Sequence, residues 1–200
     1  IFMQISLGLN FMAPTPLFTL IMDDYGINRG VVSLLVSAPI IVLTISLLPS
    51  GILISKIGSK RAMVIGGLLM SSGLIAPLLD SFTMMVLMRL LFGVGAAICL
   101  PVTSSILMEW FKPNELPVMN GINESGRSVG VAFGILAAVS IANVFGWDMV
   151  FFFFGVLPMV ATFIWFVGGR SADVVQEQSD EFSLSNNIDL IFGRNTLLIA

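Results

Sequence analysis

Six stretches of the sequence are long, apolar and almost free of charge. They run over residues 1–22, 30–55, 62–79, 81–108, 128–147 and 149–169, and only Arg89 interrupts one of them. A helix needs about 20 residues to cross the roughly 30 Å hydrocarbon core of a bilayer. A membrane span must satisfy its backbone polar groups internally, and the sequence lacks the alternation of barrel strands. Each stretch is therefore predicted to be a transmembrane helix.

The composition excludes an ordinary soluble protein. Of the 200 residues, 56% are hydrophobic and 10% are charged, whereas a soluble domain carries about 25% charged residues. The chain has one cysteine and no histidine, so it lacks an internal disulfide, the commonest metal ligand and the commonest catalytic base. We therefore expect no enzyme, no cofactor and no metal site. The nine basic residues are scattered, which argues against nucleic-acid binding.

The polar and apolar segments divide the chain into three parts. Residues 1–169 are expected to form an all-α integral membrane bundle of six transmembrane helices. Residues 170–194 are rich in Ser, Gln, Asn and acidic residues and are expected to form a cytoplasmic loop. Residues 195–200 are mostly apolar and are expected to begin a seventh transmembrane helix. On this basis the chain is expected to be a fragment of a longer protein.

Lysine and arginine residues lie mainly on one side of the predicted bundle. The loops on that side hold six of them, against Arg29 alone on the other side. Cytoplasmic loops carry such an excess, so a multi-pass protein of the cell (inner) membrane with a cytoplasmic N-terminus is expected. The six residues are Lys56, Lys60, Arg61, Lys112, Arg170 and Arg194.

Two glycines and three cations mark the connection between the second and third spans. The glycines suit a tight turn, and the cations suit a cytoplasmic loop close to helix C-termini, where the helix dipole is negative. The order of residues over 51–61 resembles the loop motif of the major facilitator superfamily, with Ser55 where that family usually has Asp. The resemblance implies a role in conformational switching. The loop residues concerned are Gly51, Ser55, Lys56, Gly58, Lys60 and Arg61.

Small residues in the fourth and fifth spans indicate close helix packing. The fourth span resembles a second motif of the same family from Arg89 onward, with Phe92 in place of the usual polar residue. The fifth span has a small residue at every fourth position, a stripe that lets another helix approach closely and resembles the glycine-rich fifth helix of the family. The glycines expected to pack against other helices are Gly93, Gly95, Gly126, Gly130 and Gly134.

The resemblance covers essentially the whole chain and implies the N-terminal half of a twelve-span major facilitator fold. In such a fold, two six-helix bundles rock about a central site, which gives bound solute alternating access to the two sides of the membrane. The partners implied are a small-molecule solute, membrane lipids, the C-terminal six-helix half and a coupling ion.

Arg89 is the first candidate for solute binding. A cation inside a span costs about 2.5–3.5 kcal/mol on insertion scales and is retained when it has a partner. We expect Arg89 about 8 Å from the middle of its span, toward the outer side. Two interpretations stay open: Arg89 binds an anionic solute or takes part in switching, or it only hydrogen-bonds helix ends.

Asn10 and Arg127 are two further candidates for solute binding. Asn10 lies near the middle of the first span, where it either lines a pathway or forms a hydrogen bond between helices. Arg127 is expected at the inner edge of the fifth span. There it either contacts solute or forms a surface ion pair with Glu124, three residues earlier.

The charges inside the predicted spans are cationic, which favours an anionic or strongly polar small solute. We therefore expect a secondary active or facilitative transporter that works by alternating access. Two other functions stay open. An exporter of lipophilic compounds would use an apolar cavity and tolerate loss of Arg89, and a transport-like membrane sensor would bind solute without moving it.

Overall fold

Six helices that are long and apolar enough to cross a membrane make up the described part of the chain. The structure is a computed structural model and describes residues 1–169. Within that range it contains helices and turns and no strand, which confirms the predicted all-α class. The predicted loop over 170–194 and the predicted start of a seventh helix over 195–200 lie outside the described residues.

Three of the crossings are interrupted and three are single helices. The first consists of α1 (Phe2–Met12), the 3₁₀ turn η1 (Thr15–Leu17) and α2 (Phe18–Tyr25). The second consists of α3 (Arg29–Val32) and α4 (Leu34–Ile57), and the third of α5 (Ser59–Met70) and the 3₁₀ segment η2 (Ser71–Leu78). The last three are α6 (Phe82–Trp110), α7 (Leu116–Phe145) and α8 (Trp147–Gly168).

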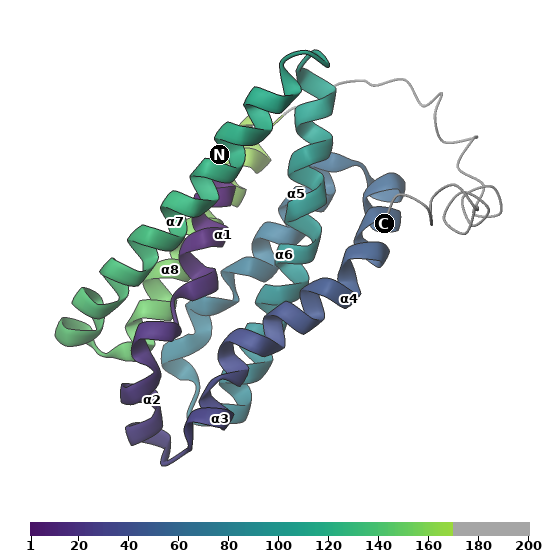
Figure 1. Cartoon of the computed structure of the whole chain (residues 1–200). Helices are drawn as coiled ribbons and strands as arrows, with labels where there is room; N and C mark the ends of the chain where they lie inside the picture. Colours follow the sequence, from purple (N-terminus) through teal and green to yellow (C-terminus); the bar gives the residue numbers. More distant parts are fainter. Residues whose placement is uncertain (170–200) are drawn as a thin grey trace, which may run out of the picture.

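The crossings lie side by side, and their connections gather at the two ends of the bundle (Figure 1). Helix α1 packs mainly on α7, α4 mainly on α6, and α8 on η2 and α5. The connections at one end carry mostly cations and those at the other mostly acids. We call the first the basic end, which holds Lys56, Lys60, Arg61 and Lys112, and the second the acidic end, which holds Asp23, Asp24, Asp80 and Asp148.

The fifth crossing is longer than the sequence pattern predicts. The expected span began at residue 128, whereas α7 begins at Leu116 and has 30 residues, or about 45 Å of helix. The polar residues that suggested the later start, including Glu124 and Arg127, lie on turns of the helix. Pro117 in the first turn, where a missing N–H is harmless, is the sequence signal of the real start. Trp147, expected to end the fifth span, is instead the first residue of α8.

The connection between the second and third crossings is shorter than the motif over 51–61, because all residues of the motif except Gly58 are helical. Gly58 alone joins α4 to α5, and its φ of 80° is one that residues other than glycine rarely adopt. A cation is favourable near a helix C-terminus, so the charge of Lys56 does not end α4. Accordingly, Gly51, Ser55 and Lys56 lie in the last turns of α4, and Lys60 and Arg61 lie in the first turn of α5.

Helix α7 approaches α1 through its stripe of glycines. A Cβ atom at Gly130 would overlap the carbonyl oxygen of Ile5, and one at Gly134 would lie 2.7 Å from that of Leu9. At Gly126 the nearest atom would be at an ordinary contact distance of 3.4 Å. The two helices therefore touch along their backbones at Gly130 and Gly134, at separations that no larger residue permits.

Two glycines of α6 allow α4 and α5 to approach it equally closely. A Cβ atom at Gly93 would lie 2.7 Å from the carbonyl oxygen of Pro39 on α4. One at Gly95 would lie 2.6 Å from the carbonyl oxygen of Gly66 on α5. Because the two positions face different helices, α6 sits between α4 and α5 in close contact with both.

Replacing Gly130 with alanine is expected to destabilise the protein, because the added Cβ would overlap the Ile5 carbonyl and push α1 away from α7. Such overpacking costs about 1–3 kcal/mol. The control is Gly121→Ala on the same helix, where a Cβ meets nothing within 4 Å. Alanine there should be neutral or stabilise the helix by about 0.5–1 kcal/mol. Apparent melting temperatures of the full-length protein in detergent test this, and equal values for the two variants would contradict the packing.

Candidate functional site

Arg89 lies inside the described bundle with 2% of its surface exposed. From α6, its guanidinium donates to three main-chain carbonyl oxygens. Nε donates to Leu35 at 2.8 Å, Nη1 to Asn10 at 3.0 Å and Nη2 to Phe11 at 3.2 Å. The guanidinium carbon also lies 4.7 Å from the centre of the Phe92 ring, a cation–π contact. Carbonyl dipoles and an aromatic face thus surround the charge of Arg89.

The contacts of Arg89 join α6 to α4, on which it packs, and to α1. Leu35 belongs to α4, whereas Asn10 and Phe11 lie near the end of α1. Among residues 1–169, no carboxylate lies within ion-pair distance of Arg89. These contacts match the interpretation in which Arg89 hydrogen-bonds helix ends. Binding of solute by Arg89 stays a prediction.

Asn10 also connects two helices. Its side chain is 2% exposed, and Nδ2 donates to the carbonyl oxygen of Ser6 in its own helix at 3.0 Å. The same atom donates to the carbonyl oxygen of Phe154 on α8 at 2.8 Å. This is the hydrogen bond between helices that the sequence left open as one of two alternatives. A role of Asn10 in lining a pathway stays a prediction.

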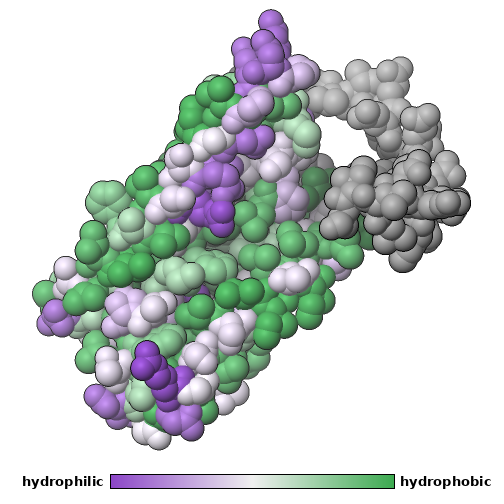
Figure 2. Space-filling model, in the orientation of Figure 1, coloured by the Kyte–Doolittle hydropathy of each residue, from purple (hydrophilic) through white to green (hydrophobic). Residues whose placement is uncertain are grey.

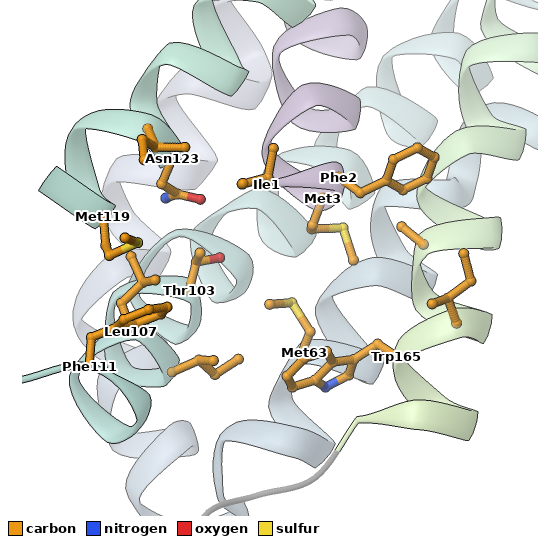
Figure 3. Close-up of a pocket in the computed structure, with 14 residues that line it drawn as sticks. Ile1, Phe2, Met3, Met63, Thr103, Leu107, Phe111, Met119, Asn123 and Trp165 are labelled. Atoms are coloured by element: carbon orange, nitrogen blue, oxygen red, sulfur yellow. The ribbon is translucent and has the colours of Figure 1, made fainter. Parts of the chain in front are cut away.

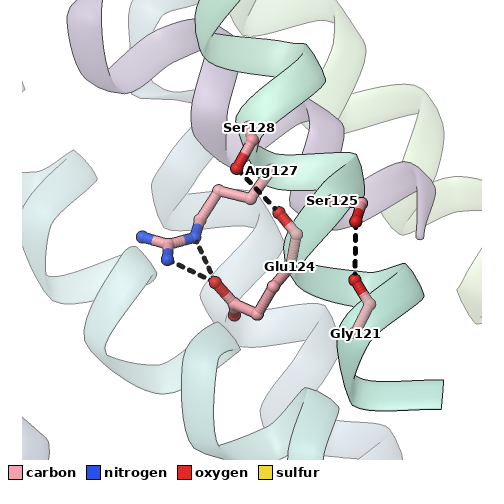
Figure 4. Close-up of polar contacts among 5 residues, drawn as sticks. All are labelled: Gly121, Glu124, Ser125, Arg127 and Ser128. Carbon is pink, nitrogen blue, oxygen red and sulfur yellow. Dashed lines mark hydrogen bonds and ion pairs between the residues drawn. The ribbon is translucent and has the colours of Figure 1, made fainter. Parts of the chain in front are cut away.

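Arg127 differs from Arg89 in exposure and in partner. Its Nε donates to Oε2 of Glu124 at 2.9 Å, and its Nη2 donates to the same oxygen. The two side chains are 44% and 50% exposed, and they form the one ion pair among the described residues. Figure 4 shows both side chains reaching away from α7, while Ser125 lies on another side of the helix. The predicted pairing of Arg127 with Glu124 is therefore present.

Helix α7 extends beyond Arg127 in both directions. The sequence placed it at the inner edge of the span, but α7 continues for 11 residues, about 16 Å, from Arg127 back to Leu116. In the other direction 18 residues, about 27 Å, separate it from Phe145. The hydrocarbon core is about 30 Å thick, so a core that begins near Phe145 ends close to Arg127, and its placement at the inner edge of the span stays a prediction.

Figure 2 shows where polar residues gather on the face that includes α7. Hydrophilic residues lie over the upper part of α7, with hydrophobic surface on both sides of them. The polar residues of α7 that are exposed include Asn120, Glu124, Arg127 and Ser128, and Glu124 lies three or four residues from each of the other three. This spacing puts them on one side of the helix, so α7 presents a polar strip in an otherwise apolar surface.

Glu109 makes contacts between helices that sequence reasoning missed, because it was assigned to a loop. It lies in the last turn of α6, where its Oε1 accepts from Ser59 Oγ at the start of α5 and from Ser105 Oγ at 3.4 Å. A carboxylate is favourable at a helix N-terminus, and it offsets Lys60 and Arg61 in the first turn of α5. The four-residue spacing from Ser105 to Glu109 was the signal available in the sequence.

A cavity of about 350 Å³ lies at the basic end between five helices (Figure 3). Its wall is mainly apolar, with Met3 of α1 and Met63 of α5 among its residues. The polar groups in the wall are few: the amide of Asn123, the hydroxyl of Thr103 and the indole of Trp165. Its lining, drawn from the described residues, contains no charged side chain. The cavity therefore suits an apolar molecule better than an anion.

Acidic side chains meet an aromatic pair at the other end of the bundle. Trp147 Nε1 donates to Asp24 Oδ2 at 3.2 Å, and the rings of Trp147 and Tyr25 lie 5.7 Å apart. These three residues line an open cavity of about 410 Å³ together with Asp80 and Asp148. Within residues 1–169, no group of three potential metal ligands is close enough to hold an ion.

Comparison with known proteins gives one family for the whole chain. The family model described as "Major Facilitator Superfamily" matches residues 1–200. The chain is 26% identical to an uncharacterised protein of Campylobacter jejuni over 187 residues, which cover 93% of this chain and 57% of that protein.

Two other relatives have names that state a transported solute. A probable anion transporter of Oryza sativa subsp. japonica is 28% identical over 150 residues, 74% of this chain and 34% of that protein. A riboflavin transporter of Clostridioides difficile is 26% identical over 192 residues, 96% of this chain and 40% of that protein. The chain thus spans between about a third and three fifths of the length of these relatives.

The two arginines of the spans are expected to differ in their effect on stability. Arg89→Met leaves three buried carbonyls without their donor and should destabilise the full-length protein by about 2–4 kcal/mol. Arg127→Met removes a half-exposed ion pair and should change stability by less than about 1 kcal/mol. Thermal unfolding in detergent measures both. A loss at Arg127 as large as that at Arg89 would contradict the difference in burial.

Proposed function

The chain belongs to the major facilitator superfamily, and we propose that it forms the N-terminal half of a transporter for a small anionic or strongly polar solute. Transport would be secondary active or facilitative and would proceed by alternating access between two six-helix halves. The observation that supports the anionic class is the half-exposed pair of Arg127 and Glu124 on α7. The name of the rice relative, a probable anion transporter, points in the same direction.

The exposure of Arg127 indicates which side of the bundle faces the pathway. Charged side chains inside membrane spans face protein or a water-filled cavity, because contact with lipid tails costs several kcal/mol. In the described half, both side chains of this pair are about half exposed, and it is the one ion pair among residues 1–169. The polar strip on α7 therefore forms one wall of the pathway, and the C-terminal half lies opposite.

Glu124 gives Arg127 a partner while solute is absent. Arginine binds carboxylates and phosphates through two parallel hydrogen bonds, so an anionic solute competes for the same guanidinium. Because the pair is exposed, exchange of Glu124 for a solute carboxylate does not require opening of the helix bundle. Arg127 is thus the solute-binding cation of this half, and Arg89 and Asn10 support the helices around it.

The distribution of charges supports an orientation. The cations at the basic end fit a cytoplasmic face of the inner membrane. The N-terminus of α1 lies at the same end, so it would be cytoplasmic. In this orientation, Arg127 lies closer to the cytoplasmic than to the outer end of α7.

A second candidate function is export of lipophilic compounds. The observation that favours it is the uncharged, mainly apolar cavity between Met3, Met63 and Trp165. Its volume of about 350 Å³ is near the lower end for small-molecule pockets, about 300–1,000 Å³. Such an exporter would tolerate loss of Arg127, since the cavity contains neither arginine.

Loss of Arg127 is expected to reduce anion transport strongly. The full-length protein in liposomes is first tested for thermal stabilisation by sugar acids, carboxylates, inorganic phosphate, riboflavin and ethidium, and the best anion is then used in uptake and counterflow assays. Arg127→Met should lower its uptake at least tenfold, because the lost contact involves a charged group worth about 1.5–3 kcal/mol. Ser125→Ala, on another side of the same helix, is the control and should retain uptake.

Three other results would point elsewhere. Stabilisation by ethidium with unchanged efflux in Arg127→Met would favour the exporter. Stabilisation by riboflavin alone would exclude an anionic solute. Binding of an anion without counterflow would favour a membrane sensor.

A further inference from the structure

Three of the buried hydrogen bonds follow one rule: the acceptor carbonyl lies four residues before a proline. Leu35 precedes Pro39 in this way, and its carbonyl accepts from Arg89 Nε. The carbonyl of Asn10 precedes Pro14 by four residues and accepts from Arg89 Nη1. The third case is the carbonyl of Phe154, four residues before Pro158, which accepts from the side chain of Asn10.

The spacing of four has a direct physical cause. In an α-helix, the carbonyl of residue i accepts from the N–H of residue i+4, and proline has no N–H. Each of these prolines therefore leaves one carbonyl without its normal donor. In a bilayer no water is available to replace that donor, so an unsatisfied carbonyl is strongly destabilising.

The replacement donors come from other helices. Arg89 belongs to α6, whereas its proline-freed acceptors lie on α4 and at the end of α1. Asn10 belongs to α1, and its acceptor lies on α8. Satisfying the freed carbonyls therefore ties each proline-containing crossing to a neighbour, and a single planar guanidinium with its donors in fixed directions serves two freed carbonyls at once.

We infer that Arg89 and Asn10 are positioning residues matched to Pro14, Pro39 and Pro158, and that together they hold the three proline-containing crossings against their neighbours so that the half moves as one body. This role is separate from solute binding at Arg127. In this role, each donor is needed for stability only while the matching proline leaves its carbonyl without an N–H donor. Replacing the proline should therefore reduce the loss of stability that follows from removing the donor.

The test is a double-mutant cycle on Arg89 and Pro39 in the full-length protein, with apparent melting temperature in detergent as the readout. Arg89→Met should lower it by about 5–10 °C. Pro39→Ala should also lower it, because the new alanine then supplies the N–H to Leu35 and Arg89 Nε loses its acceptor. The decrease in melting temperature of Arg89→Met/Pro39→Ala should be clearly smaller than the sum of the decreases in the two single variants.

Pro49 provides the matched control on the same helix. It also lies inside α4, but within residues 1–169 no side chain donates to the carbonyl of Ile45, four residues earlier, which is exposed. Arg89→Met/Pro49→Ala should therefore lose the sum of its two single effects. Additive losses in the Pro39 cycle, or equal suppression by Pro49→Ala, would overturn the inference.

A second cycle decides the case in which Arg89→Met gives no folded protein. Asn10→Leu removes the donor to Phe154 while filling a similar volume, and Pro158→Ala restores an N–H within α8. Their double variant should again lose less than the sum, and additivity would overturn the inference. Neither cycle uses a solute, so failure here and failure of the transport proposal are separate results.

Discussion

A backbone carbonyl inside a bilayer must have a hydrogen-bond donor, and the rest of the bundle depends on how this requirement is met. Proline removes the donor within the helix but also bends it, which membrane proteins use to shape their helices. At Pro14, Pro39 and Pro158 the missing donors are replaced by Arg89 and Asn10, which belong to neighbouring helices. A local defect in one helix thus becomes a fixed contact between two helices.

Close packing and these hydrogen bonds depend on each other. Gly93 has no Cβ, so α6 lies directly on the backbone of α4 at Pro39. Arg89 is one turn earlier on the same face of α6, which brings its guanidinium within reach of Leu35. A larger residue at position 93 would move α6 away from α4, and the same movement would lengthen the hydrogen bond that satisfies the freed carbonyl. Glycine and arginine here form one structural unit.

The crossings could be predicted from the sequence because lipid exposure demands long apolar runs, and this demand acts on each helix separately. The ends of α4 and α7 could not, because Lys56, Glu124 and Arg127 are charged and yet helical. The prolines indicated which carbonyls lack a donor, but the sequence did not say which helix would supply one. The acceptors of Arg89 are main-chain atoms, so the side chains of the residues that carry them do not indicate that the donor is Arg89.

The two arginines show that the depth of a cation in a span does not indicate its function unless its hydrogen-bond partner is also known. Arg89 has neutral acceptors that belong to the folded backbone, so exchanging them for a solute would reopen three carbonyls. Arg127 has an exposed carboxylate partner on its own helix, and exchanging that partner leaves the packing of the bundle unchanged. Cations that bind solute must release one partner for another at little cost. By that criterion the exposed pair is suited to a pathway, and the buried arginine is suited to holding the helices that line it.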